Sequence, residues 1–117
     1  MATVSLGDHV VLDLYPKKED GTAPERAFSL LLEPNSLLIL TGDLYTSFMH
    51  GIAERADDYI DASYANVDTS RHVRFFLLYA CVNNGTAAQG TTLTRTDTRV
   101  SLTFRVVQRV LKAKILF

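Results

Sequence analysis

The sequence predicts an all-β sandwich or barrel, and three observations support this fold class. Short apolar segments alternate apolar with polar residues or carry β-branched pairs, as in VSLGDHVVLDLY (4–15) and TRVSLTFRVV (98–107). Turn-forming residues separate these segments at short intervals, for example at Pro34–Asn35. Little of the chain has a helical pattern, so packed β-sheets are favoured over alternating helices and strands.

The expected strands in the first half of the chain are bounded by such turns. They cover residues 4–15 (broken near Gly7–Asp8), 27–33 and 37–40. The stretch PKKEDGTAPER, 16–26, has two prolines and a glycine, which is typical of an exposed loop. LLIL at 37–40 is expected to be a short buried strand, and the chain then runs through a turn towards His50.

In the second half, three carboxylates lie close together at Asp57, Asp58 and Asp61. They lack the alternating oxygen ligands and the central glycine of a calcium loop. We therefore expect a solvated acidic surface there. RHVRFFLLYACV (71–82) resembles a strand, and the glycine-containing stretch at 83–92 is expected to be a loop.

Composition limits the possible classes of protein. Hydrophobic residues make up 47% of the 117-residue chain, which allows one compact domain. No apolar run reaches the roughly 18 residues of a membrane span, so we expect no membrane association. The one cysteine, Cys81, cannot form an internal disulfide and lies in an apolar run, which favours a buried structural thiol in a reducing compartment.

Charge is distributed unevenly along the chain. Between Leu93 and Phe117 there are six basic residues and one acid, so the rest of the chain is acidic although the net charge is only −1. A basic C-terminal segment can approach nucleic-acid phosphates. A solvated sheet edge is the alternative explanation.

The clearest candidate site is the strand TRVSLTFR, 98–105. Because side chains alternate along a strand, Val100, Leu102, Phe104 and Val106 are expected to enter the core, and Arg99, Ser101, Thr103 and Arg105 to face the other way. That second face is either an ordinary solvated surface or the lining of a barrel mouth. In a mouth, an arginine would bind a carboxylate through two hydrogen bonds.

His50 is the other candidate, although one imidazole cannot hold a metal by itself. Neither His9 nor His72 is paired in sequence with a carboxylate, and the chain contains no His-x-Asp or His-x-Glu. Nucleophile-elbow, phosphate-loop and zinc-site motifs are also missing from the sequence.

Two segments in order, SLLLEPNSLLILTGDLYTSFMHGI (29–52) and TRVSLTFR (98–105), resemble the C-terminal half of the AlkB-like 2-oxoglutarate- and Fe(II)-dependent dioxygenases. The preceding VSLGDHVVLDLY is most similar to the eukaryotic homologue-six branch of that family. The resemblance covers roughly residues 3–52 and 93–111. It implies a partial double-stranded β-helix, or jelly roll, formed by residues 1–117 as part of one dioxygenase domain, with an atypical insert near 66–92.

The resemblance also implies roles for four residues. His50 matches the distal histidine of an iron-binding triad of two histidines and a carboxylate. Arg99 matches the arginine that pairs with the far carboxylate of 2-oxoglutarate, with Ser101 as a polar contact and Arg105 as the second arginine of the motif. The implied reaction is oxidative demethylation of alkylated RNA or DNA, in the nucleus and cytoplasm.

The family's His-x-Asp pair belongs upstream of VSLGDHVVLDLY and has no counterpart here. We therefore expect a fragment or truncated isoform that is inactive alone, with no catalytic residue of its own. Two alternatives remain open. One is a non-catalytic β module that binds a protein or nucleic-acid partner through its basic C-terminus, and the other is a small jelly-roll binding protein whose arginine strand faces solvent.

Overall fold

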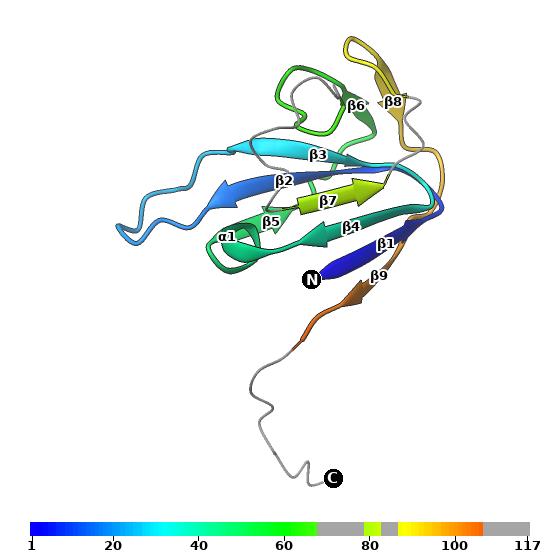
Figure 1. The fold of residues 1–117 in the computed structure, drawn as a ribbon. Coiled ribbons are helices and arrows are strands. Elements are labelled where there is room, and N and C mark those ends of the chain that lie inside the picture. Colours follow the sequence, from blue (N-terminus) through cyan, green and yellow to red (C-terminus); the bar gives the residue numbers. More distant parts are fainter. Residues whose placement is uncertain (68–78, 83–86, 107–117) are drawn as a thin grey trace, which may run out of the picture.

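The computed structural model describes residues 1–67, 79–82 and 87–106, and within these the chain is built almost wholly of antiparallel strands (Figure 1). In chain order the elements are β1 (Ala2–Leu6), β2 (Val10–Pro16), β3 (Phe28–Leu32), β4 (Ser36–Leu40), α1 (Gly42–Thr46), β5 (Phe48–Gly51), β6 (Asp57–Tyr59), β7 (Tyr79–Val82), β8 (Thr92–Thr94) and β9 (Val100–Phe104). In the described part of the chain, no helix is long and apolar enough to cross a bilayer.

The strands form two sheets and a small ribbon. The first sheet has the order β7-β4-β1-β9, the second has the order β3-β2-β5, and β6 pairs with β8. Every pairing of named strands is antiparallel. The first two sheets lie against each other in Figure 1. The all-β, partial jelly-roll prediction is therefore confirmed, whereas the one-turn helix α1 was not predicted.

Two tight turns connect strands of different sheets. Asn35 takes a positive φ of 61° between β3 and β4, as the Pro34–Asn35 pair predicts. Gly7 takes φ 86° between β1 and β2. A Cβ at Gly7 would lie 2.1 Å from the carbonyl oxygen of Thr98, so glycine lets these two backbone segments approach closely.

Leucines fill the space between the first two sheets. This core cluster consists of Val10, Leu12, Leu14, Phe28, Leu30 and Leu32 from the second sheet, Leu38 and Leu40 from β4, and Leu44 from α1. Each such side chain, when fully buried, stabilises the fold by roughly 1.5–3 kcal/mol. Alternate residues of the expected LLIL strand point the other way, because Ile39 is 37% exposed.

Strands β2 and β3 are buried on both faces. On the side away from the first sheet, Val11 and Leu31 pack with Ile60 and Tyr64, and Leu93 of β8 joins this second cluster. Strands in sheets that are covered on both sides have near-continuous apolar sequences, and the sequence of β3, FSLLL, has this pattern.

The prediction that the apolar residues of the arginine strand enter the core is wrong. Leu102 is 47% exposed, Phe104 61% and Val106 87%. The reason lies in the pairing of β9 with β1, which places Thr103 opposite Thr3 and Ser101 opposite Ser5. The polar side of β1 and β9 therefore faces the second sheet, and an apolar strip runs along their outer side.

We expect this outer strip to make the chain self-associate. An exposed apolar surface on a strand that ends the described sheet favours contact between copies. The double substitution Leu102→Thr and Phe104→Thr removes two exposed apolar groups, so sedimentation velocity should show a larger monomer fraction with an unchanged melting temperature. A large fall in melting temperature would instead mean that these side chains are buried.

Candidate functional site

A cavity of about 120 Å³ opens between the first two sheets. Its apolar wall includes Leu12, Leu32 and Leu38 from the core cluster. Its polar lining consists of Thr3, His50, Arg99, Ser101, Thr103 and Arg105. The cavity thus lies where the polar inner face of β1 and β9 meets Leu38 of the neighbouring β4 and the leucines of the opposite sheet.

Arg99 is the half-buried cation of this cavity. Its Nη2 donates a hydrogen bond to Ser5 Oγ at 2.9 Å, and its buried Nε has no partner. No carboxylate among the described residues pairs with it, and burial lowers the pKa of the guanidinium. A buried donor without a partner is costly, so an anionic ligand that accepted from Nε would remove that cost.

Hydroxyl groups surround the guanidinium. Thr3 Oγ1 and Thr103 Oγ1 lie 3.2 Å apart and share a hydrogen bond, while Ser101 stands between Arg99 and Thr103 on the same face of β9. Such groups both donate and accept. They can therefore supply further donors to a carboxylate that Arg99 has bound.

His50 reaches the same cavity from the second sheet. It lies on β5, opposite Leu14 of β2, and its side chain is exposed to solvent at the cavity mouth. Arg105 follows the end of β9 and lines the mouth as well. The structure thus brings together His50, Arg99, Ser101 and Arg105, the four residues singled out from the sequence. Their roles as ligands stay predictions.

The residues present fit a small dicarboxylate better than a complete iron site. Arg99 offers a buried donor to an anion, and among the described residues no acid lines the cavity. In the described residues, by contrast, no three His, Cys, Asp or Glu side chains gather closely enough to hold a metal ion. Of the three protein ligands expected for the iron, His50 is the one found among the described residues.

Sequence reasoning missed a buried charge network centred on Asp58. We expected this carboxylate to belong to a solvated acidic surface, but it is fully buried, whereas Asp57 and Asp61 are exposed as expected. Arg95 donates to it through Nε (2.7 Å) and Nη2 (2.9 Å), and Arg55 donates through Nε at 2.6 Å. The fold requires this compensation, because a buried carboxylate without partners is strongly unfavourable.

A histidine completes the network. His9 Nε2 lies 2.9 Å from Asp58 Oδ2, and its Nδ1 lies 3.2 Å from Asp8 Oδ1. Burial opposes ionisation of Asp58, but the hydrogen bonds from Arg95, Arg55 and His9 outweigh it and lower the pKa of that carboxyl. His9 thus has two carboxylate partners: Asp8, which directly precedes it in the sequence, and Asp58, which lies 49 residues away.

This network holds the segment that leads into β9. Asp8 Oδ2 accepts hydrogen bonds from the backbone N–H groups of Thr96 (2.6 Å) and Asp97 (2.8 Å). The N–H of Asp97 is the main reason that the pKa of Asp8 is lowered. Together with the close approach at Gly7, these contacts set where Arg99 enters the sheet.

The sequence does carry a weak signal for this network. Asp58 stands two residues before Ile60, and Arg95 two residues after Leu93, so each shares a strand face with a residue of the second core cluster. An acid and an arginine on the inward faces of paired strands indicate a buried ion pair.

We expect Asp58→Ala to destabilise the chain by about 3 kcal/mol, because it leaves Arg95 and His9 without their shared acceptor in a buried site. Denaturant unfolding of the chain measures this change. Asp57→Ala is the matched control. The carboxylate of Asp57 is exposed, and among the described residues it accepts a hydrogen bond only from Thr94 Oγ1, at 2.7 Å. Equal effects of the two substitutions would show that Asp58 is not buried.

Comparisons with known proteins show what this chain is similar to. The chain is 32% identical, over 123 aligned residues, to a zebrafish (Danio rerio) protein described as "Probable RNA/DNA demethylase ALKBH6". The match covers 98% of this chain and 45% of that protein, so the chain spans less than half the length of its relative. It also runs across residues 66–92, whose status as an insert stays a prediction. No family model and no solved structure matches.

The similarity extends over nearly the whole chain, and the all-β fold agrees with it. The resemblance seen in the sequence is confirmed: over nearly its whole length, this chain resembles an AlkB-like protein.

Proposed function

We propose that this chain is the co-substrate-binding part of an AlkB-like Fe(II)- and 2-oxoglutarate-dependent dioxygenase. The observation that carries the proposal is the guanidinium of Arg99. It lies half-buried in a cavity between two sheets, and in the part of the chain that the structure describes its Nε has no partner and no acid neutralises it. Such a group is suited to one carboxylate of a small dicarboxylic acid, which a planar arginine binds with two hydrogen bonds.

In this proposal the chain's own residues bind and orient. Arg99 anchors the far carboxylate of 2-oxoglutarate, and Ser101 donates a further hydrogen bond. Arg105, at the mouth, neutralises charge nearer the substrate, and His50 offers an imidazole nitrogen to Fe(II). When bound in a complete site, iron and 2-oxoglutarate would supply the oxidising chemistry for demethylating an alkylated nucleic acid.

The chain by itself is proposed to be inactive. Its sequence has no His-x-Asp, and one histidine gives little affinity for a metal that needs three protein ligands. Alkylated RNA or DNA as substrate, a protein partner for the fragment, and a nuclear and cytoplasmic location are parts of the same proposal. The name of the zebrafish relative supports a nucleic-acid substrate.

The alternative of a binding module that uses a basic C-terminal surface has less support. Arg95 and Arg99 contribute to the basic count of that region, but one is paired with Asp58 and the other lines the cavity. Arg109, Lys112 and Lys114 lie outside the described residues.

We expect the chain to bind 2-oxoglutarate weakly through Arg99. Isothermal titration should show that Arg99→Ala lowers the affinity by at least about tenfold, because a charge-assisted hydrogen bond to a carboxylate contributes about 1.5–3 kcal/mol. Arg26→Ala is the matched control, since Arg26 is a partly exposed arginine outside the cavity. Unchanged affinity in Arg99→Ala would refute its role as the anchor.

We expect no succinate to form when the chain is incubated with Fe(II), 2-oxoglutarate, ascorbate and a methylated oligonucleotide. 2-Oxoglutarate cannot be oxidised by this route unless the iron has its complete set of protein ligands. The assay measures succinate against a complete AlkB-like enzyme as the positive control. Turnover that is lost in His50→Ala would contradict the proposal that the chain is inactive alone.

A further inference from the structure

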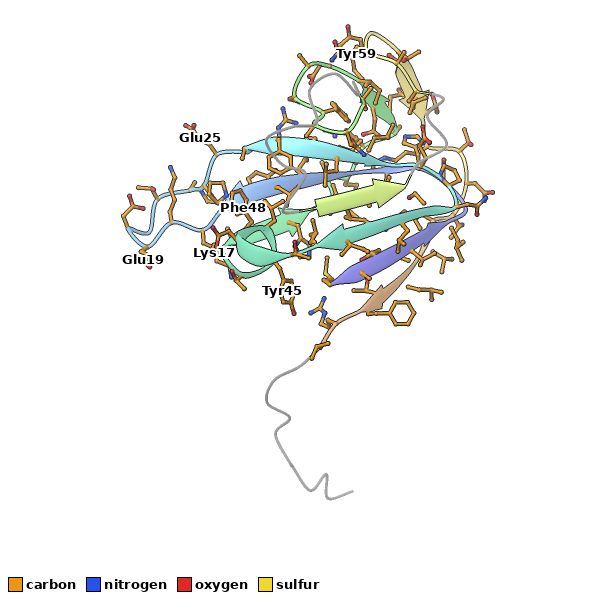
Figure 2. The ribbon with its side chains drawn as sticks, viewed as in Figure 1. Lys17, Glu19, Glu25, Tyr45, Phe48 and Tyr59 are labelled. Atoms are coloured by element: carbon orange, nitrogen blue, oxygen red, sulfur yellow. The ribbon has the colours of Figure 1, made fainter. Side chains whose placement is uncertain are left out.

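The imidazole of His9 lies buried between two carboxylates. The residue directly precedes β2 and is only 7% exposed. Its Nε2 lies 2.9 Å from Asp58 Oδ2 and its Nδ1 lies 3.2 Å from Asp8 Oδ1, so each ring nitrogen is within hydrogen-bond distance of an acid. Asp58 comes from β6, next to Tyr59, which Figure 2 labels beside the β6–β8 ribbon. The ring therefore bridges this ribbon and the turn that follows β1.

Two hydrogen bonds from this ring to carboxylates require two N–H groups. An ionised carboxylate only accepts hydrogen bonds, whereas a neutral imidazole has one N–H and one nitrogen with a lone pair. The backbone N–H of Asp97 lowers the pKa of Asp8. Burial opposes ionisation of Asp58, but hydrogen bonds, led by that from Arg95, lower the pKa of its carboxyl. Because both acids are ionised at neutral pH, His9 can donate to both only as an imidazolium cation.

Further charged groups surround the ring. They are Arg55 and Arg95, which bond Asp58, Glu33, which follows the Val10–Leu32 pair at the end of β3, and Asp97, whose N–H bonds Asp8. The arginines disfavour another cation and the acids favour it. Among the described residues, the groups that contact the two ring nitrogens are both carboxylates, and these closest charges favour the protonated ring.

Asp8 connects this ring to the strand that carries Arg99. Its Oδ1 also accepts the backbone N–H of His9 at 2.8 Å, and its Oδ2 accepts the N–H groups of Thr96 and Asp97. Two residues after Asp97, the guanidinium of Arg99 lies in the cavity. The carboxylate of Asp8 thus joins the end of β1 to the segment that positions this cation.

Loss of one proton from His9 weakens this connection. The remaining N–H stays on Nε2, because that contact is the shorter one and the fully buried Asp58 is the costlier carboxylate to leave without a donor. The lone pair is then on Nδ1, which faces Oδ1 of Asp8. Two acceptors at hydrogen-bond distance repel each other, so the carboxylate moves away and its hold on the segment before β9 weakens.

We propose that protonation of His9 regulates the anion site at Arg99. The imidazolium keeps Asp8 bonded to the segment before β9, and deprotonation releases that segment and weakens carboxylate binding. His9 does not line the cavity, so it acts as a positioning residue. The inference rests on the proposed function in one respect, namely that the anion bound by Arg99 is 2-oxoglutarate.

Nitrogen NMR of the 117-residue chain tests the charge state of the ring without any ligand. At about pH 7, both ring nitrogens of His9, identified by their absence in His9→Gln, should appear as N–H nitrogens. As the pH rises, Nδ1 should lose its proton first. The amide protons of Thr96 and Asp97 should then exchange with water faster than the change in pH alone explains.

The chain offers a matched pair of variants for the exchange measurement. Asp8→Asn should leave the two amides poorly protected at every pH. Asp20→Asn is the control, because Asp20 also accepts a backbone N–H, that of Thr22 at 3.0 Å, but in an exposed loop. Figure 2 shows its neighbour Glu19 far from Tyr59. Asp20→Asn should therefore behave as the unaltered chain does.

Titration with 2-oxoglutarate tests the regulation. The affinity of the unaltered chain should fall at least about fivefold between about pH 6 and about pH 9, the lower end of the usual range for coupled sites. The ligand's carboxylates and the Arg99 guanidinium keep their charges over this range. His9→Gln should bind weakly with little pH dependence, because its amide stays neutral. His50 lines the cavity and also titrates, so His50→Gln should keep the fall if His9 causes it.

Three results would overturn the inference. They are a lone-pair nitrogen in His9 at about pH 7, protection of the two amides that does not follow the titration of His9, and a fall in affinity that persists in His9→Gln. If only the proposed function is wrong, no variant binds 2-oxoglutarate, while the ring nitrogens and the amides still respond to pH as described. If only the regulation is wrong, 2-oxoglutarate binding still depends on Arg99 but not on the charge of His9.

Discussion

The half-buried positive charge of Arg99 is the constraint on which this structure depends. The described part of the chain places no acid beside it, and a single serine hydroxyl receives one of its five N–H groups. A fold optimised only for stability would expose such a side chain or pair it. Here the polar face of β9 turns inward and its apolar residues lie at the surface, so the sheet forgoes apolar burial to keep a cation inside. A site built to receive an anion accounts for this arrangement.

Two features hold that cation in place. The first is pairing of β9 with β1, which sets the register that turns Ser101 and Thr103 inward with Arg99. The second is the network around Asp58, which fixes the segment before β9 through Arg95, His9 and Asp8. Acids compensate the charges of the arginines in the Asp58 network, whereas among the described residues no acid compensates the charge of Arg99. We therefore infer that the network is structural and propose that the cavity binds a ligand, because uncompensated burial is typical of sites that await one.

The sequence was sufficient for the fold class and the Pro34–Asn35 turn, because strand alternation and turn chemistry are local signals. The convergence of His50 with the arginine strand was expected only from the family resemblance. It failed where tertiary pairing decides. Alternation shows that Leu102 and Arg99 lie on opposite faces, but only the pairing with β1 shows which face is inside. Asp58 reads as a surface acid until β8 brings Arg95 beside it from 37 residues away. The bridge from Asp58 through His9 to Asp8 was not predicted either, because the sequence does not show that β6 lies beside a residue 49 positions away.

The most direct test of the account observes the Arg99 guanidinium itself. In ¹H–¹⁵N spectra of the arginine side chains, the Nε–H resonance of Arg99, identified by its absence in Arg99→Lys, should exchange slowly with water and shift as 2-oxoglutarate is added. Those of the surface arginines should stay in place. A resonance that exchanges as quickly as an exposed arginine, or that does not respond to 2-oxoglutarate, would contradict the claim that this cation is half-buried in the cavity and binds a carboxylate there.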